Sequence, residues 1–407
     1  MHQSITEKIP KQPVLSCASF HQQEGLPALC VLDAGAVQYV NRGSLALALA
    51  LKHMKLAPND EVLIPAYHCI AMVEPVLWNG GKPRFYRIRE DTSLDLADLE
   101  ARVNPFCRAV IAPHYFGFHQ DMEAIRQLCD RHQLVLIEDC AHAFFGIHAG
   151  RPLGYFGDYA IGSAWKFFPI DEGACLVSSR RDLSGASTVH GGLFSEFKSF
   201  SNTLEYALEY DRLGTVNPAL RGLMHLKDWL WSVIKPESAR QLVGDGDTEN
   251  PAAGGMTGFD GNRVRTSCSM WSRWVIGAVS RKRIVRNRRE NFKKLLVALG
   301  DLPGCRPLFS TLPDEVVPHV FPLVMDAPEV VFPRLKGVGV PVIRFGEFLW
   351  SGMEKGLCPV SEDYSRRIFQ FPCHQDLNDT ELDWMIARIQ EIMLTLGTTA
   401  HSSGTAA

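Results

Sequence analysis

The chain has 407 residues, of which 46% are hydrophobic and 21% are charged, and this length allows one large domain and a smaller one. Its formal net charge of −3 is too small to favour nucleic acid as the main partner. The opening stretch MHQSITEKIPKQPVLS lacks the apolar core of a signal peptide, and no later stretch reaches the roughly 18 consecutive apolar residues of a membrane-spanning helix.

The 11 cysteines are scattered along the chain without any C-x-x-C spacing. This pattern predicts free thiols in a reducing cytoplasm, with neither a disulfide framework nor a zinc site. We therefore expect a cytoplasmic protein without a metal centre.

Between about residue 36 and residue 180, short apolar runs alternate with helical patterns. The runs are nearly unbroken in Val, Ile and Leu, as is typical of strands that are covered on both faces. The predicted strands are 61–67, 82–88, 108–117, 134–140, 158–165 and 173–179, and the predicted helices between them are 44–56 and 121–133. Repeated strand–helix units predict an α/β domain with a mostly parallel sheet.

The pattern weakens after this region and then changes. The predicted elements are helices at 191–213 and 221–236, a loop at 243–258, one long helix at 271–299, strands at 319–325 and 341–345, and an amphipathic helix at 380–393. The last three predict a smaller α+β domain. The expected divisions are an N-terminal arm over 1–28, a large domain over 29–285 with an atypical insertion at 181–260, a small domain over 286–397 and a disordered tail over 398–407.

Two segments allow alternative interpretations. The basic run at 281–294 suits either a nucleotide diphosphate or, more simply, a solvated helix face. The side chains of Trp229, Leu230 and Trp231 suit a membrane surface, a hydrophobic substrate or ordinary packing.

Three features lie where predicted strands end and ligands usually bind. Gly43 and Ser44 open a helix, where free N–H groups and a hydroxyl could hold a phosphate, although Ser44 could also be an ordinary N-cap. Asp139 ends an apolar strand and His142 follows it, so the carboxylate could keep a heterocyclic nitrogen protonated or could form a helix cap or an ion pair.

The third feature is Lys166, which stands in the otherwise apolar run IGSAWKFFPIDEGACLV. Burial lowers the pKa of a lysine amine, which then can form a Schiff base; the alternative is a lysine whose head group reaches water. A phosphate cradle, an acidic partner for a ring nitrogen and a Schiff-base lysine are together what pyridoxal 5′-phosphate requires.

Several segments then resemble one known family. They are Arg42-Gly43-Ser44, NDEVLIPAYHC, HYFGFHQDMEAI, LIEDCAHA, SAWKFFPIDEGA and FPCHQDLNDTELDWMIARI. In this order and spacing they resemble the DegT/DnrJ/EryC1/StrS aminotransferases, over roughly residues 35–180 and 260–395. The resemblance implies the PLP-dependent transferase fold type I, with a seven-stranded, mostly parallel sheet and a smaller C-terminal domain.

The resemblance also implies roles for single residues. Lys166 is expected to hold the cofactor as a Schiff base, and Asp139 to pair with its pyridinium nitrogen. Gly43, Ser44 and Ser163 are expected at the phosphate. His142 takes the position of a Gln or His that lies beside the ring in the family.

The sequence departs from the family pattern at two points. Cys69 stands where the family has an aromatic residue over the cofactor ring, which leaves its thiol edge, Tyr67 or His68 to cover that face. The family Asn that contacts the phosphate of the neighbouring subunit has an approximate match in Asn262 of FDGNRVRTS, where Arg265 aligns with the family Arg. We expect the smaller side chain at residue 69 to leave room for a bulky acceptor, with 181–260 supplying the rest of the pocket wall.

The implied activity is transfer of an amino group from glutamate or glutamine to a keto sugar that is linked to a nucleoside diphosphate, for a surface polysaccharide or a glycosylated metabolite. The implied assembly is a homodimer with a shared active site. The alternatives are a sugar dehydratase, a non-sugar substrate and a non-catalytic homologue. Because the family's dehydratases replace the lysine with histidine, Lys166 argues against the first.

Overall fold

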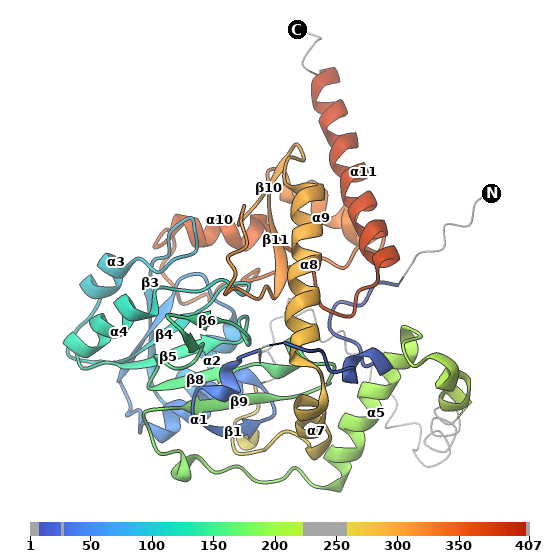
Figure 1. The fold of residues 1–407 in the computed structure, drawn as a ribbon. Coiled ribbons are helices and arrows are strands. Elements are labelled where there is room, and N and C mark those ends of the chain that lie inside the picture. Colours follow the sequence, from blue (N-terminus) through green and yellow to red (C-terminus); the bar gives the residue numbers. More distant parts are fainter. Residues whose placement is uncertain (1–7, 26–27, 223–258, 404–407) are drawn as a thin grey trace, which may run out of the picture.

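The computed structural model describes residues 8–25, 28–222 and 259–403, which form a large sheet with its helices and a smaller C-terminal sheet (Figure 1). The helix α8 (Arg281–Leu299) runs from the large sheet to the smaller one, where it packs on the C-terminal strands and helix.

The large sheet has seven strands. Their spatial order is β1 (Ala36–Val40), β9 (Ala174–Ser178), β8 (Tyr159–Gly162), β5 (Val135–Cys140), β4 (Cys107–Pro113), β2 (Glu61–Pro65) and β3 (Lys82–Tyr86). The strand β9 runs antiparallel to both of its neighbours, and all other pairs are parallel. The mostly parallel sheet predicted from the apolar runs is thereby confirmed.

The smaller sheet has four strands and is antiparallel throughout, in the order β10 (Cys305–Pro307), β11 (Val320–Met325), β13 (Ile368–Pro372) and β12 (Ile343–Arg344). A separate two-stranded ribbon consists of β6 (Ile147–His148) and β7 (Arg151–Pro152). The smaller sheet has its own core with the C-terminal helices, which fits the expected α+β arrangement.

The α-helices fall into two groups along the chain. The helices before α8 are α1 (Gly43–His53), α2 (Ile70–Trp78), α3 (Leu96–Ala101), α4 (Met122–Arg131), α5 (Leu193–Glu209) and α7 (Met270–Ala278). The helices after α8 are α9 (Pro328–Gly337), α10 (Pro359–Arg367) and α11 (Asp379–Ser403). Every residue of α1 from Leu45 to Leu51 is buried, which explains why its Leu-Ala sequence carries no polar face.

Three sequence-based expectations about elements need correction. The single helix expected at 271–299 is wrong, because the extended backbone of Val279 separates α7 from α8 and the hydroxyl of Ser280 accepts a hydrogen bond from the Arg283 N–H. The strand β1 was not predicted, since its short sequence is partly exposed. The tail expected at 398–407 is wrong for 398–403, which continue α11, because extending an existing helix needs no new nucleus.

Other expectations lie outside the described residues. They include the loop at 243–258, nearly all of the helix expected at 221–236, and the side chains of Trp229, Leu230 and Trp231. None of the described helices has the length and apolarity that crossing a bilayer requires.

Four cations of the basic run at 281–294 pair with carboxylates from other elements, in the pairs Arg281–Asp33, Arg283–Asp376, Arg289–Asp314 and Lys294–Asp379. These four side chains are therefore not simply solvated, and the expectation of a nucleotide diphosphate at this run stays a prediction. These ion pairs connect α8 to the segments that carry the four aspartates.

One buried carboxylate organises the centre of the large sheet. Glu138 on β5 is fully buried and accepts hydrogen bonds from the N–H groups of Gly154 at 2.6 Å, Gly157 at 3.1 Å and Phe156 at 3.2 Å. His114 Nε2 lies 3.0 Å from the same carboxylate. Because neighbouring residues of a strand face opposite sides of a sheet, this anchoring also fixes the residue after Glu138 on the other face.

We expect Glu138→Gln to lower the free energy of unfolding by about 2 kcal/mol, because a neutral amide replaces a buried charged acceptor and adds donors that have no partner. Urea unfolding followed by circular dichroism measures the change. The matched control is the exposed Glu123 on α4, where Glu123→Gln should stay within about 0.5 kcal/mol of the unmodified protein. Equal effects of the two substitutions would contradict the anchoring role.

Candidate active site

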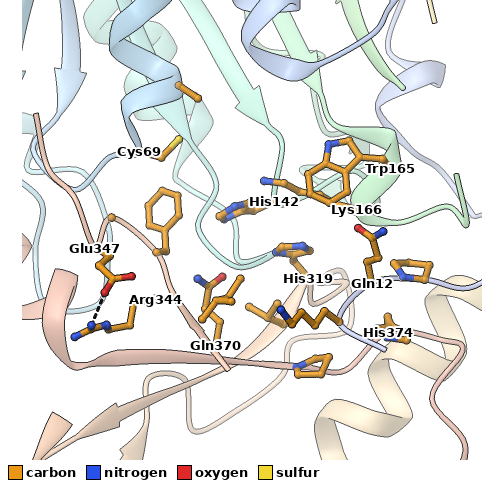
Figure 2. A pocket seen from close by; sticks show the side chains of 18 of the residues that line it. Gln12, Cys69, His142, Trp165, Lys166, His319, Arg344, Glu347, Gln370 and His374 are labelled. Carbon is orange, nitrogen blue, oxygen red and sulfur yellow. Dashed lines mark hydrogen bonds and ion pairs between the residues drawn. The ribbon is translucent and has the colours of Figure 1, made fainter. Parts of the chain in front are cut away.

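Two adjoining cavities lie where β4, β5 and β8 end. The inner one has a volume of about 180 Å³ and the outer one about 430 Å³. The inner cavity brings together seven residues that the sequence pointed to: Gly43, Ser44, Cys69, Asp139, His142, Ser163 and Lys166. Figure 2 shows Lys166 and His142 reaching toward one another from the same wall of the outer cavity, with His319 beneath them.

The first helix of the large domain presents its N-terminus to the inner cavity. Arg42 is its N-cap and gives no side-chain hydrogen bond, so the first N–H groups of α1 are available to a ligand. Ser44 lies inside the helix rather than at its cap, which removes the alternative interpretation as an ordinary N-cap. A Cβ atom on Gly43 would lie 3.8 Å from Ser163 Oγ, so the helix start and the buried Ser163 face each other.

Lys166 ends a short 3-10 helix, Ala164–Lys166, directly after β8. Its side chain lines both cavities. Burial lowers the pKa of its amine, while the nearby Cys69 and Asp139 act in the opposite direction. The alternative of a lysine head group in open water therefore does not fit.

Asp139 is the next-to-last residue of β5 and is buried. Burial raises the pKa of its carboxyl, which the N–H of Ala141, at 2.9 Å from Oδ1, and the charge of Lys166 partly counteract. Within the described part of the chain no cation forms an ion pair with Asp139. The alternative interpretation as an ion pair is thus not supported, and the carboxylate keeps acceptor capacity toward the cavity.

Cys69 lines both cavities just before α2 begins, and burial raises the pKa of its thiol. Its neighbour Tyr67 does not line either cavity. The Tyr67 ring packs instead among Tyr115 at 5.4 Å and Phe345 at 5.0 Å, between ring centroids. The expectation that Tyr67 covers a cofactor is wrong, because this aromatic cluster buries it.

His68 is also turned away from the cavities. Its Nδ1 lies 2.9 Å from the carbonyl oxygen of Ala66, and its Nε2 accepts the N–H of Trp350 at 3.1 Å. Its ring stacks on Phe85, and burial lowers the pKa of the imidazole to about 4. Because both nitrogens are engaged in the fold, the expectation that His68 covers the cofactor is wrong as well.

Two aromatic residues that the sequence did not single out line both cavities, namely Trp165 and Phe345. Trp165 precedes Lys166 and could have been found from that position alone. Phe345 follows β12 of the smaller sheet, so no local signal links it to the site. Within 181–222 and 259–260, the described parts of the atypical insertion, no residue lines either cavity.

The N-terminal arm forms part of the outer cavity. Lys11, Gln12 and Pro13 line it. The arm is attached on both sides of this stretch, since His374 Nε2 lies 2.9 Å from the Pro10 carbonyl oxygen and the Val14 N–H donates to Asp376 at 3.1 Å.

Asn262 is exposed in the short 3-10 helix Gly261–Arg263 and lines neither cavity of its own chain. Its N–H donates to Asp260 Oδ1 at 3.0 Å. Arg265 is also exposed and donates to the Gly185 carbonyl at 3.4 Å. The expected contact of Asn262 with a neighbouring subunit stays a prediction.

Burial makes the charged forms of Asp139 and Lys166 costly when the cavity holds no ligand. The carboxyl pKa is raised, so the stability linked to this group is complete below about pH 3.9 and is lost as the pH rises through the folded pKa. The amine pKa is lowered, so the stability linked to it is complete above about pH 10.4 and is lost as the pH falls through the folded pKa. At neutral pH, which lies between these limits, both groups cost stability.

We therefore expect Asp139→Asn to raise the free energy of unfolding of the ligand-free protein by about 1 kcal/mol at pH 7.5, a gain that shrinks toward pH 4. Urea unfolding at both pH values measures it. The exposed Asp301 offers a control, because Asp301→Asn should change neither value by more than about 0.5 kcal/mol. A loss of stability at pH 7.5, or a gain that does not depend on pH, would contradict this account.

Comparison with known proteins finds similar sequences and similar folds. The model of the DegT/DnrJ/EryC1/StrS aminotransferase family matches residues 31–179. The chain is similar to GDP-perosamine synthase of Vibrio cholerae, with 34% identity over 143 residues, which are 34% of this chain and 39% of that protein. It is also similar to the dTDP-4-dehydro-2,3,6-trideoxy-D-glucose 4-aminotransferase of Saccharopolyspora spinosa, with 25% identity over 367 residues, or 86% of this chain and 83% of that protein.

The fold is also similar to that of solved sugar aminotransferases. The pyridoxal-phosphate form of the putative sugar aminotransferase Spr1654 of Streptococcus pneumoniae superposes with a TM-score of 0.62 at 15% identity, covering 88% of this chain and 87% of that one. This likeness confirms the expected fold class. Residues 31–179 thus match the DegT/DnrJ/EryC1/StrS aminotransferase family model, and the described fold is similar to that of a solved sugar aminotransferase.

Proposed function

We propose that the protein is a pyridoxal-phosphate-dependent aminotransferase that moves an amino group from glutamate or glutamine to a keto sugar linked to a nucleotide. The observation that carries this proposal is the inner cavity, where the half-buried Lys166, whose amine has a lowered pKa, and the buried carboxylate of Asp139 share one space with the N-terminus of α1.

The donor set of this cavity fits pyridoxal phosphate. The N–H groups at Gly43 and Ser44, with the Ser163 hydroxyl, suit a phosphate, because a helix N-terminus favours an anion. Asp139 suits the ring nitrogen, and the lowered pKa of Lys166 suits a Schiff base with the aldehyde. When bound, the cofactor supplies a pyridinium ring that withdraws electrons from the carbon next to the substrate nitrogen.

The residues of the chain then have separate tasks. The Asp139 carboxylate holds a proton on the ring nitrogen, and its burial strengthens this interaction because little water screens it. The Lys166 amine first binds the cofactor and then, once displaced, moves a proton as general base and general acid. His142 borders the same space as a neutral imidazole, since burial and Lys166 lower its pKa well below the ordinary value.

The substrate class rests on the relatives and on the outer cavity. The Saccharopolyspora spinosa relative is named for a dTDP-linked keto sugar, and the Vibrio cholerae relative for GDP-perosamine. The outer cavity offers an aromatic face from Trp165 and polar groups from Arg344 and Gln370, a combination that suits a sugar and its charged substituent. Biosynthesis of a surface polysaccharide or a glycosylated metabolite is the corresponding role.

The alternatives have less support. A sugar dehydratase of this family carries histidine in place of Lys166. In a non-catalytic homologue, Asp139 and Lys166 would lower the stability of the folded protein without serving a ligand. That both are present therefore argues against this alternative. The inner cavity does not distinguish a sugar from a non-sugar acceptor, and the names of the relatives favour a sugar.

Assembly and location are part of the proposal. A homodimer would explain why Asn262 is exposed on its own chain although the family pattern places it at a phosphate. The free cysteines favour the cytoplasm. The division into an arm, a large domain to residue 285 and a small domain from 286 is also proposed, and α8 then crosses the boundary.

We expect borohydride reduction of the protein loaded with pyridoxal phosphate to leave the pyridoxyl group on Lys166, as peptide mass mapping would detect. The physical reason is that its amine is the one placed in the inner cavity. Lys166→Ala should lose the visible absorbance of the Schiff base, whereas the exposed Lys82, which lines neither cavity, provides a control, since Lys82→Ala should keep it. A pyridoxyl group found on another lysine refutes the assignment.

We expect sedimentation at micromolar concentration to give a species of twice the chain mass of 45.4 kDa. Asn262→Ala should weaken cofactor binding about tenfold, as loss of one hydrogen bond to a charged group implies, without changing unfolding of the isolated chain. A stable and active monomer rules out the shared site.

A further inference from the structure

Two histidines from different sheets stack on each other beside Lys166. His142 follows β5 of the large sheet, and His319 directly precedes β11 of the smaller one. Their ring centroids are 4.7 Å apart and the ring planes differ by 23°. His319 lines the outer cavity but has no part in the family pattern described above.

Among the described residues, His142 is oriented by its contacts with other rings. No hydrogen bond from the described residues reaches its imidazole. Phe116 lies parallel on one side, with centroids 5.9 Å apart at 26°, and the edge of Phe345 packs at 4.9 Å and 71°. His319 is the nearest of these rings, so it contributes most to fixing the imidazole plane.

The backbone of His319 is fixed relative to Lys166. Its N–H donates to the Phe116 carbonyl at 2.8 Å. Its own carbonyl accepts a hydrogen bond from Arg288 at 2.9 Å, and the same guanidinium donates to the Lys166 carbonyl at 2.7 Å. One buried side chain thus sets the distance between the stacked pair and the lysine.

The two imidazoles can lie face to face because neither carries a charge near neutral pH. Burial lowers the pKa of both well below the ordinary value, and each is lowered further by neighbouring positive charge. His319 Nδ1 is buried without a partner among the described residues, so no hydrogen bond from that atom competes with the stack in orienting the ring.

We infer that His319 is a positioning residue, which holds His142 by stacking in the orientation that borders the cofactor and so makes the smaller sheet part of the site. The effect of His319 on cofactor binding rests on the proposed function, whereas the stack of His319 on His142 does not depend on it. What His319 contributes is a flat ring, because stacking and not a hydrogen bond links the pair.

Two substitutions of His319 distinguish the effect of a flat ring from the effect of side-chain volume. His319→Phe keeps a ring, and His319→Leu keeps comparable bulk without one. The first measurement is proton NMR of the protein without cofactor, with the ring protons of His142 identified by their absence in His142→Gln. The signals should lie upfield in the unmodified protein and in His319→Phe, and should move downfield in His319→Leu by the part of this displacement that the His319 ring contributes, while the part from Phe116 remains.

The second measurement is titration with pyridoxal phosphate, followed by visible absorbance. His319→Leu should weaken binding about 2- to 10-fold, the effect of losing one stacked ring, and His319→Phe should stay within about 2-fold. The control is His53, whose contact with the Tyr159 ring, 5.7 Å away and edge-on, lies outside the cavities. His53→Leu should leave both measurements unchanged.

Equal losses in His319→Phe and His319→Leu would assign the effect to a ring nitrogen and overturn the inference, as would a His319→Leu protein that behaves like the unmodified one. If either variant does not fold, the unmodified protein decides, because His142 signals without an upfield displacement exclude the stack. Failure of the unmodified protein to bind pyridoxal phosphate would contradict the proposed function alone, since the NMR measurement needs no cofactor.

Discussion

The burial of one amine and one carboxylate around a single small cavity is the constraint on which the rest of the site depends. Neither Lys166 nor Asp139 gains enough from the other to offset its loss of hydration, as the directions of their pKa shifts indicate. Such groups stay in place only if the surrounding structure holds them there. Much of the fold near the cavity can be understood as that support.

The support comes from hydrogen bonds made on the far side of each group. Behind Asp139, the Glu138 carboxylate is saturated by backbone donors, which fixes the end of β5. Behind Lys166, the guanidinium of Arg288 forms no ion pair with a carboxylate of the described residues and donates instead to carbonyl and amide oxygens. Its pKa of about 10, lowered by burial, still leaves it charged at neutral pH, so these hydrogen bonds persist.

Sequence reasoning succeeded where the signal is local. The strands of the large sheet are short runs buried on both faces, and the residues at their ends keep fixed positions in the chain, so Asp139, Ser163 and Lys166 were found together. It failed where contacts are distant, because nothing near His319 or Phe345 indicates that the smaller sheet places them beside Lys166.

Two other errors have physical causes. The motif around Cys69 was expected to offer a neighbouring ring to the cofactor, but Tyr67 and His68 are taken up by packing and by backbone hydrogen bonds. The break at Ser280 was missed because a weak capping signal stands within a strongly basic helical pattern, and only the extended backbone of Val279 reveals it.

The attachment of the N-terminal arm has a practical consequence for work with this protein. Gln12 and its neighbours form part of the wall of the outer cavity, and this segment is held in place at Pro10 and Val14. Residues 10–14 therefore border the cavity that the proposed function assigns to the substrate. A truncation that removes residues 8–14 takes away part of that wall, which under the proposed function borders the acceptor. Comparisons of ligand binding between preparations therefore depend on whether these residues are kept.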